Sequence, residues 1–287
     1  MKRNLIVAII AVILISCFPE ENLNIPVTEN NVELSPLDEE IQSRFTNEYG
    51  MAIRYRFDNN LVSPNQKVTP PKLAAVPEML DFIEDFWIDP YKDIDNGIPF
   101  FKRHVPAEIV FLGGLIYNSN GTVILGTADA GARITFTNVN SINPQDSVWR
   151  DLQLQTVYHE FAHTIHQLYK LPPSFEQISP QGYTSPGSWF TLEDDEALRR
   201  GFVSPYATSN ANEDFAETVA HFLYDPLFET ETIVDVADCE DIDCERKNAG
   251  RELIRQKIFA IKAHYKDEVN IDLDQLRASI QEKIDLL

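Results

Sequence analysis

Residues 146–170 of this 287-residue chain read DSVWRDLQLQTVYHEFAHTIHQLYK and predict the helix on which the fold depends. Asp146 and Ser147 are both competent N-caps, and Pro172 stops the helix soon after Lys170. Apolar residues recur along it at steps of three and four, which predicts one stripe facing a core. The stripe consists of Leu154, Val157, Phe161, Ile165 and Leu168. Because an α-helix has 3.6 residues per turn, the histidines fall opposite the stripe, so we expect one buried face and one face that presents histidines.

The histidine face contains His159-Glu160-Phe161-Ala162-His163, which is the H-E-x-x-H pattern of a zinc site. Residues four apart lie on the same face of a helix, so His159 and His163 can converge on one ion. A catalytic zinc takes three protein ligands and leaves its fourth position to water. Glu160 is offset round the helix, where it can reach that water without binding the ion. The alternative is a pair of half-buried histidines beside a surface glutamate.

The third ligand has several candidates. The long metzincin motif would need glycine at 166 and histidine at 169, but the chain has His166 and Tyr169, which excludes that subclass. His166 lies seven residues beyond His159, which is more than about 10 Å along the helix axis. One ion therefore cannot easily bind His159, His163 and His166 together. We therefore expect His166 to support the site from behind a ligand or to be an exposed histidine.

A better candidate lies in the segment NEDFAE at 212–217, which predicts a second helix. Its apolar stripe is Phe215, Val219 and Phe222. Glu213 and Glu217 lie one turn apart on the opposite face, and Glu213 would complete a His₂Glu set of the kind found in catalytic zinc sites. Alternatively, these acids occupy a first turn only because the helix dipole favours them there. Asp214 and Glu217 are candidates to orient the ligand imidazoles.

Together the two segments resemble the gluzincin-type helix pair of the anthrax lethal factor catalytic domain, in which an H-E-F-x-H helix is paired with an E-x-F-A-E helix. The resemblance implies that Glu213 is the third zinc ligand. It also implies a tyrosine seven residues before that glutamate, which assists the transition state, and Tyr206 occupies this position. The plainer interpretation of Tyr206 is a packed loop aromatic.

The N-terminus predicts a targeting signal. Two basic residues precede an apolar run at 5–15, which is much shorter than the roughly 20 residues that cross a bilayer. The run ends in LISC at 14–17, which resembles the bacterial lipobox. We therefore expect residues 1–16 to be a lipoprotein signal peptide and Cys17 to be the lipidated first residue of the mature protein. An ordinary secretory signal with a chance cysteine is the alternative.

The rest of the chain predicts a tether and one domain. Residues 17–36 are polar and acidic and predict a tether, and 37–287 show neither a repeat nor a linker. The expected elements are helices at 37–49 and 77–87, β-type runs at 109–112 and 123–125 with the hairpin signal Asn120-Gly121 between them, a half-exposed strand at 132–139, and mainly helices from 146 on. The fold class is therefore α+β, and the resemblance implies a zincin-like, gluzincin-type domain.

With the lipobox added, the whole chain resembles the zinc metallopeptidase lipoproteins of Bacteroidetes, described as substrate-import-associated metallohydrolases. The resemblance is close over about residues 155–222 and loose over 37–130. It implies one Zn²⁺ per chain, a cell-envelope location at the outer membrane through the N-terminal lipid, and outer-membrane import proteins as partners. Acidic residues after Cys17 resemble a surface-export signal.

Composition excludes several classes of protein. Asp and Glu number 45 against 24 Lys and Arg, and the resulting net charge of −21 argues against a nucleic-acid partner, because phosphate contacts need an excess of basic side chains. Three cysteines are too few for a disulfide-built scaffold. Cys239 and Cys244 either close a small loop in an oxidising compartment or remain free.

The predicted activity is hydrolysis of peptide bonds by a zinc metallopeptidase. Glu160 takes a proton from the activated water, and Tyr206 helps to hold the oxyanion. The strand at 132–139 is expected to offer an edge to an extended peptide or protein substrate. Two alternatives remain open. The same chemistry can hydrolyse a non-peptide bond, or the chain is a catalytically silent, lipid-anchored binding or assembly component of an outer-membrane nutrient-import system, with Cys239 and Cys244 closing a structural zinc site.

Overall fold

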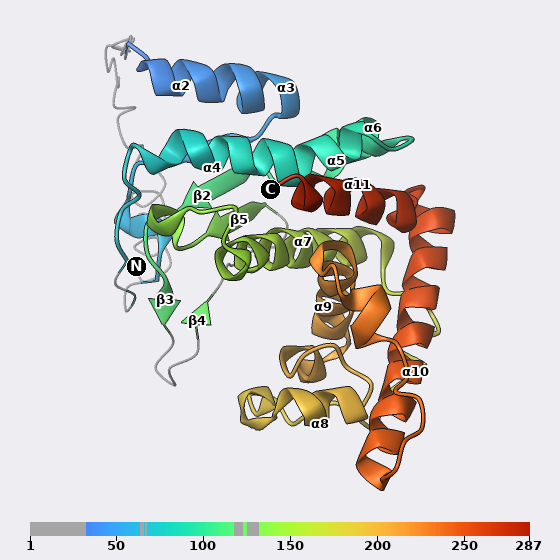
Figure 1. Cartoon of the computed structure of the whole chain (residues 1–287). Helices are drawn as coiled ribbons and strands as arrows, with labels where there is room; N and C mark the ends of the chain where they lie inside the picture. Colours follow the sequence, from blue (N-terminus) through green and yellow to red (C-terminus); the bar gives the residue numbers. More distant parts are fainter. Residues whose placement is uncertain (1–32, 64–65, 67, 118–122, 125–131) are drawn as a thin grey trace, which may run out of the picture. The chain divides into compact units, whose positions relative to one another are not determined.

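The helix expected at 146–170 is α7 (Ser147–Tyr169) of the computed structural model (Figure 1). The Asp146 side chain caps it by accepting a hydrogen bond from the backbone N–H of Val148 at 3.0 Å. Four members of the predicted stripe are buried, but Leu168 is 62% exposed, so the buried stripe ends one turn earlier than predicted.

The histidine face of α7 is mostly covered as well, so this helix is not buried along its apolar stripe alone. His159 is only 7% exposed and His166 only 9% exposed. Helix α9 (Ala211–Tyr224) packs along α7 and covers this side. The histidines of α7 therefore face a second helix.

The structure describes residues 33–63, 66, 68–117, 123–124 and 132–287, and Pro36–Leu287 form one compact unit. The expected signal peptide, Cys17, most of the 17–36 tether and the Asn120-Gly121 pair lie outside the described residues. Within the part of the chain that is described, no helix is both long and apolar enough to cross a membrane.

The main sheet is small and parallel. Its strands are β1 (Ala52–Arg54), β2 (Glu108–Phe111) and β5 (Arg133–Phe136), in the order β1-β2-β5. Strand β2 pairs in parallel with both neighbours, so the run at 109–112 is not the antiparallel partner of 123–124. A separate antiparallel pair joins β3 (Ile116–Tyr117) to β4 (Val123–Ile124).

The alternating run at 132–139 is not half-exposed. Ile134 and Phe136 are buried as predicted, but Thr135 and Thr137 on the other face are also only 3% and 0% exposed. The reason is that parallel sheets are covered on both faces, so threonine can be buried where alternation alone predicts solvent. On one side, β5 packs against α7.

Helices make up most of the remaining chain, which gives the α+β class predicted from the sequence. The α-helices are α2 (Pro36–Ile41), α3 (Asn47–Tyr49), α4 (Ala75–Ile83), α5 (Asp89–Lys92), α6 (Gly97–His104), α8 (Asp194–Arg199), α10 (Ile242–His264) and α11 (Leu273–Asp285). Wider π-helical segments at Gln42–Thr46, Glu84–Ile88, Phe228–Thr232 and Tyr265–Val269 and 3₁₀ turns at Asn59–Leu61, Val139–Ser141, Phe175–Gln177, Trp189–Thr191 and Tyr206–Ser209 complete the helical elements. The helices predicted at 37–49 and 77–87 are both present, and the second is part of a longer helical run.

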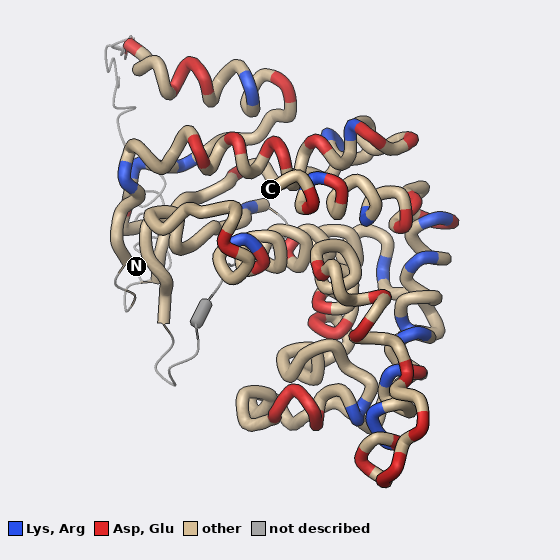
Figure 2. The backbone as a smooth tube through the Cα atoms, viewed as in Figure 1, with Lys and Arg blue, Asp and Glu red and all other residues tan. Residues whose placement is uncertain are grey.

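The C-terminal helices hold α9 in place. Lys and Arg recur along α10 (Figure 2), and one of them, Lys257, is fully buried and forms an ion pair with the buried Asp214 of α9 at 2.7 Å. The Lys257 ammonium also donates to the carbonyl of Gly201 at 2.6 Å. From α11, Arg277 donates to the carbonyl of Phe222 near the end of α9. These contacts join α9 to both C-terminal helices.

Cys239 and Cys244 form a disulfide just before and within the start of α10. Of the two possibilities left open by the sequence, the small closed loop is the one observed. Both sulfur atoms are thereby used, so they do not act as thiolate ligands of a structural zinc site.

We predict that Lys257→Met lowers the free energy of unfolding by about 3–5 kcal/mol, because it leaves the Asp214 carboxylate buried without a counter-charge. Burial already raises the pKa of Asp214 to about 6 in spite of the lysine. Denaturant unfolding measures the change. Lys266→Met, at an exposed position just after α10, is the matched control and is expected to change stability little. The double variant Asp214→Asn/Lys257→Met should lose less of the free energy of unfolding than Lys257→Met alone. An equal or larger loss in the double variant would contradict the ion-pair argument.

Candidate metal centre

Three side-chain atoms from α7 and α9 form a nearly equilateral triangle. The Nε2 atoms of His159 and His163 are 3.0 Å apart. The Oε2 atom of Glu213 lies 3.2 Å from the first nitrogen and 3.1 Å from the second. Donors bound to one tetrahedral zinc ion at about 2.0–2.2 Å are roughly 3.3 Å from one another. The triangle therefore fits a single ion held by a His₂Glu set.

Local sequence explains how each helix presents its donors. The two histidines are one turn apart on α7, so their rings lie on one face. On α9, the side chain of the N-cap Asn210 accepts hydrogen bonds from the N–H groups of Asn212 and Glu213, which holds Glu213 in the first turn. The Glu213 side chain keeps 19% of its surface exposed, so the triangle lies at the bottom of an opening.

Glu160 belongs to the same cluster. Its carboxylate and the nitrogens of His159 and His163 all lie within 4.8 Å of one another. Burial raises the pKa of Glu160 above its ordinary value, and a raised pKa suits a carboxylate that must accept a proton near neutral pH. An opening of about 280 Å³ is lined by Glu160, His163, His166, Gln167, Asn210, Asn212 and Glu213. Glu160 is thus beside the triangle and within reach of whatever enters this opening.

Glu217 supports His159 from behind. The Oε1 atom of this fully buried carboxylate lies 2.8 Å from Nδ1 of His159. Burial opposes its ionisation, but contacts with His159 and His221 outweigh burial and hold the pKa of Glu217 well below its usual range. A carboxylate in this place fixes the ring orientation and directs Nε2 to the ion.

His166 lies behind His163, one of the two candidate histidine ligands. Its Nε2 atom is 2.8 Å from Nδ1 of His163. Burial and the neighbouring His163 lower the pKa of His166 to about 4, so the ring is neutral near pH 7 and can share one proton with His163 in this contact.

Asp214 does not contact the ligand imidazoles, which corrects its expected role. Its carboxylate instead accepts hydrogen bonds from Lys257 at 2.9 Å and from the Tyr183 hydroxyl at 2.9 Å. The side chain next to Glu213 along the helix is rotated by about 100°, so it faces α10 rather than α7.

Tyr206 lies at the edge of the site on the 3₁₀ turn that precedes α9. Its ring centroid is 5.8 Å from that of His159. Burial and the nearby Glu213 raise the pKa of Tyr206, which keeps its hydroxyl protonated and able to donate. The tyrosine at the predicted spacing therefore lies beside His159, a candidate zinc ligand.

Two supporting residues were not predicted from the sequence. Gln155 donates to the Glu217 carboxylate at 3.2 Å, and its place one turn before His159 is a signal that could have revealed it. Ser204 donates to the other oxygen of Glu217 at 2.6 Å and accepts a hydrogen bond from the N–H of Ala207 at 3.1 Å. Ser204 thus joins the turn that carries Tyr206 to Glu217, the carboxylate that supports His159. No local pattern identifies it.

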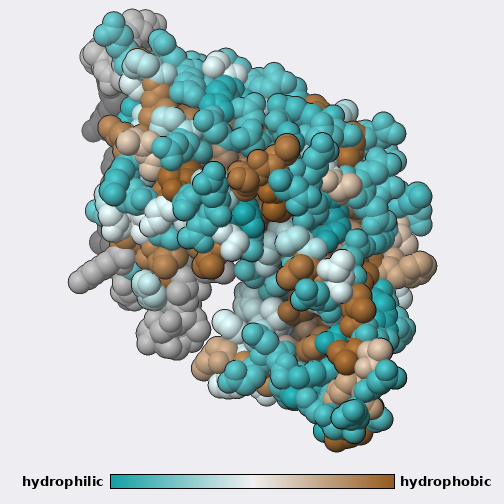
Figure 3. Space-filling model, viewed as in Figure 1, coloured by the Kyte–Doolittle hydropathy of each residue, from teal (hydrophilic) through white to brown (hydrophobic). Residues whose placement is uncertain are grey.

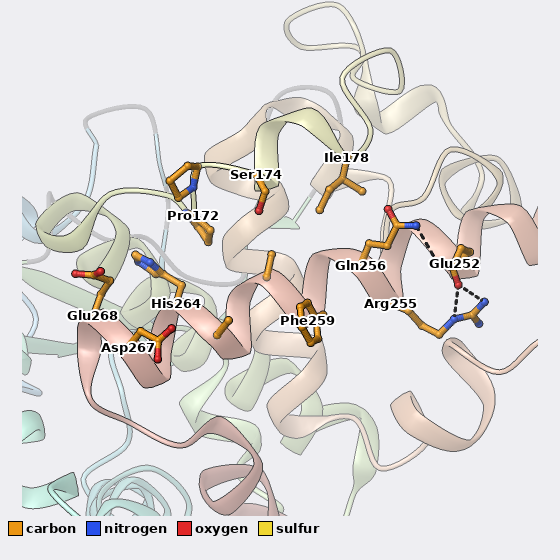
Figure 4. Close-up of a pocket in the computed structure, with 13 residues that line it drawn as sticks. Pro172, Ser174, Ile178, Glu252, Arg255, Gln256, Phe259, His264, Asp267 and Glu268 are labelled. Atoms are coloured by element: carbon orange, nitrogen blue, oxygen red, sulfur yellow. Dashed lines mark hydrogen bonds and ion pairs between the residues drawn. The ribbon is translucent and has the colours of Figure 1, made fainter.

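A larger groove of about 690 Å³ lies elsewhere, between α10 and the segment that follows α7 (Figure 4). Pro172, Ser174 and Ile178 form one side of it. Gln256, Phe259 and His264 of α10 form the other side. None of the lining residues belongs to the histidine and glutamate cluster.

Comparison with known proteins agrees with this geometry. The family model described as "Putative zinc-binding metallo-peptidase" matches residues 30–274. The chain belongs to this family. The crystal structure of a putative zinc-binding metallo-peptidase from Bacteroides caccae matches this chain with a TM-score of 0.68 at 22% sequence identity. The similarity covers 89% of this chain and 97% of that one, and it shows that the two share a fold. No curated protein matches the sequence.

Zinc binding by this family member should depend on pH. In the absence of an ion, burial opposes protonation of His159, but hydrogen bonds to Glu213 and Glu217 outweigh it and raise the pKa of the ring to about 10. Zinc needs the neutral ring and must displace this proton. We predict that the association constant for zinc rises about tenfold per pH unit between about pH 6 and 8, measured by chelator competition. An association constant independent of pH in this range would contradict the prediction.

Removing the support of His159 should weaken the metal site without unfolding the chain. We predict that Glu217→Gln lowers the zinc affinity about 10- to 100-fold. Glu193→Gln, at an exposed position ahead of α8, is the control and should leave the affinity unchanged. Unchanged affinity in the Glu217 variant would show that the carboxylate does not orient the ligand.

Proposed function

We propose that the chain is a zinc-dependent metallopeptidase that hydrolyses peptide bonds. The observation that carries the proposal is the His₂Glu triangle with Glu160 beside it and Tyr206 at its rim. His159, His163 and Glu213 would hold one Zn²⁺ per chain. When bound, zinc lowers the pKa of a water molecule toward neutrality and polarises the scissile carbonyl.

The side chains around the ion provide the remaining chemistry. Glu160 accepts the proton of the attacking water and then passes it to the leaving amine, so that one proton moves from water to product. The Tyr206 hydroxyl donates a hydrogen bond to the oxygen that gains negative charge. Glu217 and His166 hold the two imidazoles in position. The arrangement supports a gluzincin-type assignment, because two helices supply the ligands in the H-E-x-x-H and E-x-x-x-E order.

The proposal extends to location and partners. We infer that Cys17 is lipidated and anchors the domain to the bacterial cell envelope, at the outer membrane, through the tether at 17–36. The lipobox-like LISC at 14–17 is the observation that supports this. Association with outer-membrane import proteins rests on the family resemblance of the sequence. Binding of an extended peptide beside β5 also stays a prediction.

The test of catalysis is the Glu160→Gln variant. We expect about one zinc per chain in both the wild-type and variant proteins, and a loss of about 10²- to 10⁴-fold in kcat on a peptide that the wild type cleaves, because only the proton acceptor is removed. Elemental analysis and a quenched-fluorescence peptide library provide the two measurements. Full activity of the variant would rule out the proposed base.

A separate prediction concerns Tyr206. Tyr206→Phe removes the hydroxyl but keeps the ring, so we expect kcat to fall about 10²-fold while KM and zinc content change little. Tyr117→Phe, which alters an exposed tyrosine, serves as the control. A change confined to KM would indicate that Tyr206 only packs in the loop.

A further inference from the structure

Two adjacent aromatic residues, the partly exposed Trp189 and the exposed Phe190, lie next to the candidate metal centre. The Trp189 ring meets the Tyr206 ring edge-on, with centroids 4.9 Å apart, and Tyr206 in turn contacts His159. Phe190 follows, with its ring 6.0 Å from that of Trp189, and it is 46% exposed. Aromatic rings thus continue outward from a zinc ligand to the protein surface.

The segment that carries this pair is held firmly. Residues 185–188, Ser-Pro-Gly-Ser, form a turn closed by a 3.1 Å hydrogen bond from Ser188 N–H to the Ser185 carbonyl. Proline in the second position and a φ of 73° at Gly187 are the features of a type II turn. The Thr191 hydroxyl donates to the Ser188 carbonyl at 2.7 Å, which closes the next turn around the two aromatics.

The same segment is fastened to the turn of Tyr206. The N–H of Thr184 donates to the carbonyl of Thr208 at 2.8 Å. In Figure 3, apolar surface is visible at the tip formed by the segment before α8, whereas α8 itself is hydrophilic. Phe190 is 46% exposed and Trp189 is partly exposed, so part of each ring stays available to a ligand.

We propose that Trp189 and Phe190 form a substrate subsite that binds an aromatic or large apolar side chain close to the scissile bond. The inference rests on the proposed peptidase function and names its preferred substrates. The ring centroids of Tyr206 lie 5.8 Å from His159 and 4.9 Å from Trp189, so the Trp189 ring is at most about 11 Å from the His159 ring. An extended peptide advances about 3.3 Å per residue, so a chain lying over His159 reaches Trp189 within about three residues, and Phe190 lies one ring further out. The pair offers edge and face contacts to an incoming ring.

The chain contains a reporter for this subsite. Of its three tryptophans, Trp87 and Trp149 are only 1% and 4% exposed, whereas Trp189 is partly exposed. A ligand on the subsite therefore changes the fluorescence of Trp189 in particular. In the test, the full chain carrying Glu160→Gln is titrated with blocked tetrapeptides, once with zinc present and once without it. Each peptide has phenylalanine, alanine or lysine at one position and alanine at the other positions.

We expect the phenylalanine peptide to bind at least about tenfold more tightly than the alanine peptide, because its ring leaves water. Adding Phe190→Ala should reduce this preference to within about twofold while leaving Trp189 as the reporter. Phe259→Ala, which removes another exposed aromatic on α10 in the groove of Figure 4, should preserve the preference.

Other outcomes overturn the subsite. Equal binding of the phenylalanine and alanine peptides would do so, as would tighter binding of the lysine peptide or a preference that survives Phe190→Ala. Because these titrations measure binding in a variant without the proposed base, they are independent of hydrolysis. Aromatic preference without hydrolysis by the wild type would leave the subsite standing and reject the peptidase function.

Discussion

The packing of α9 against α7 is the contact on which the site depends. It brings the carboxylates of Glu213 and Glu217 on α9 to the imidazoles of His159 and His163 on α7. Glu160 of α7 already lies beside these imidazoles, so three carboxylates share a partly desolvated space. Three carboxylates confined in this way repel one another, because the local dielectric is low and water is scarce. Positive charge at the centre relieves this repulsion. Without an ion the proton on His159 supplies it, and a divalent cation would supply more.

Much of the surrounding structure keeps the two helices together. The buried Lys257–Asp214 pair ties α9 to α10, and its lysine also holds the carbonyl of Gly201 in the segment that leads to Tyr206. Ser204 fastens that segment to Glu217. One set of contacts thus fixes both the metal ligands and the residues that would act beside the ion. Desolvating a buried ion pair is costly, but losing one partner costs more, so the Lys257–Asp214 pair keeps α9 against α10.

The errors in the sequence-based predictions share a cause. The run at 132–139 alternates as a half-exposed strand does, yet its threonines are buried because a sheet with helices on it has no solvent face. Residues 123–124 do form an antiparallel pair, but with 116–117 and not with 109–112, because β2 forms the centre of a parallel sheet whose strands are distant in sequence. The predicted role of Asp214 is wrong because residue spacing within α9 does not determine which element packs against each of its faces.

The sequence by itself determined the local features of the protein. The start and end of α7 follow from the capping Asp146 and from Pro172 beyond its last turn. The shared face of His159 and His163 on α7, and the candidacy of Glu213 on α9, follow from residue spacing within each helix, which backbone geometry sets. Only the tertiary structure decided that Glu217 supports His159 while Asp214 meets Lys257, that Ser204 joins the Tyr206 turn to the site, and that Trp189 and Phe190 extend it to the surface. These are contacts between elements far apart in sequence, and they depend on how the helices pack, which no local pattern specifies.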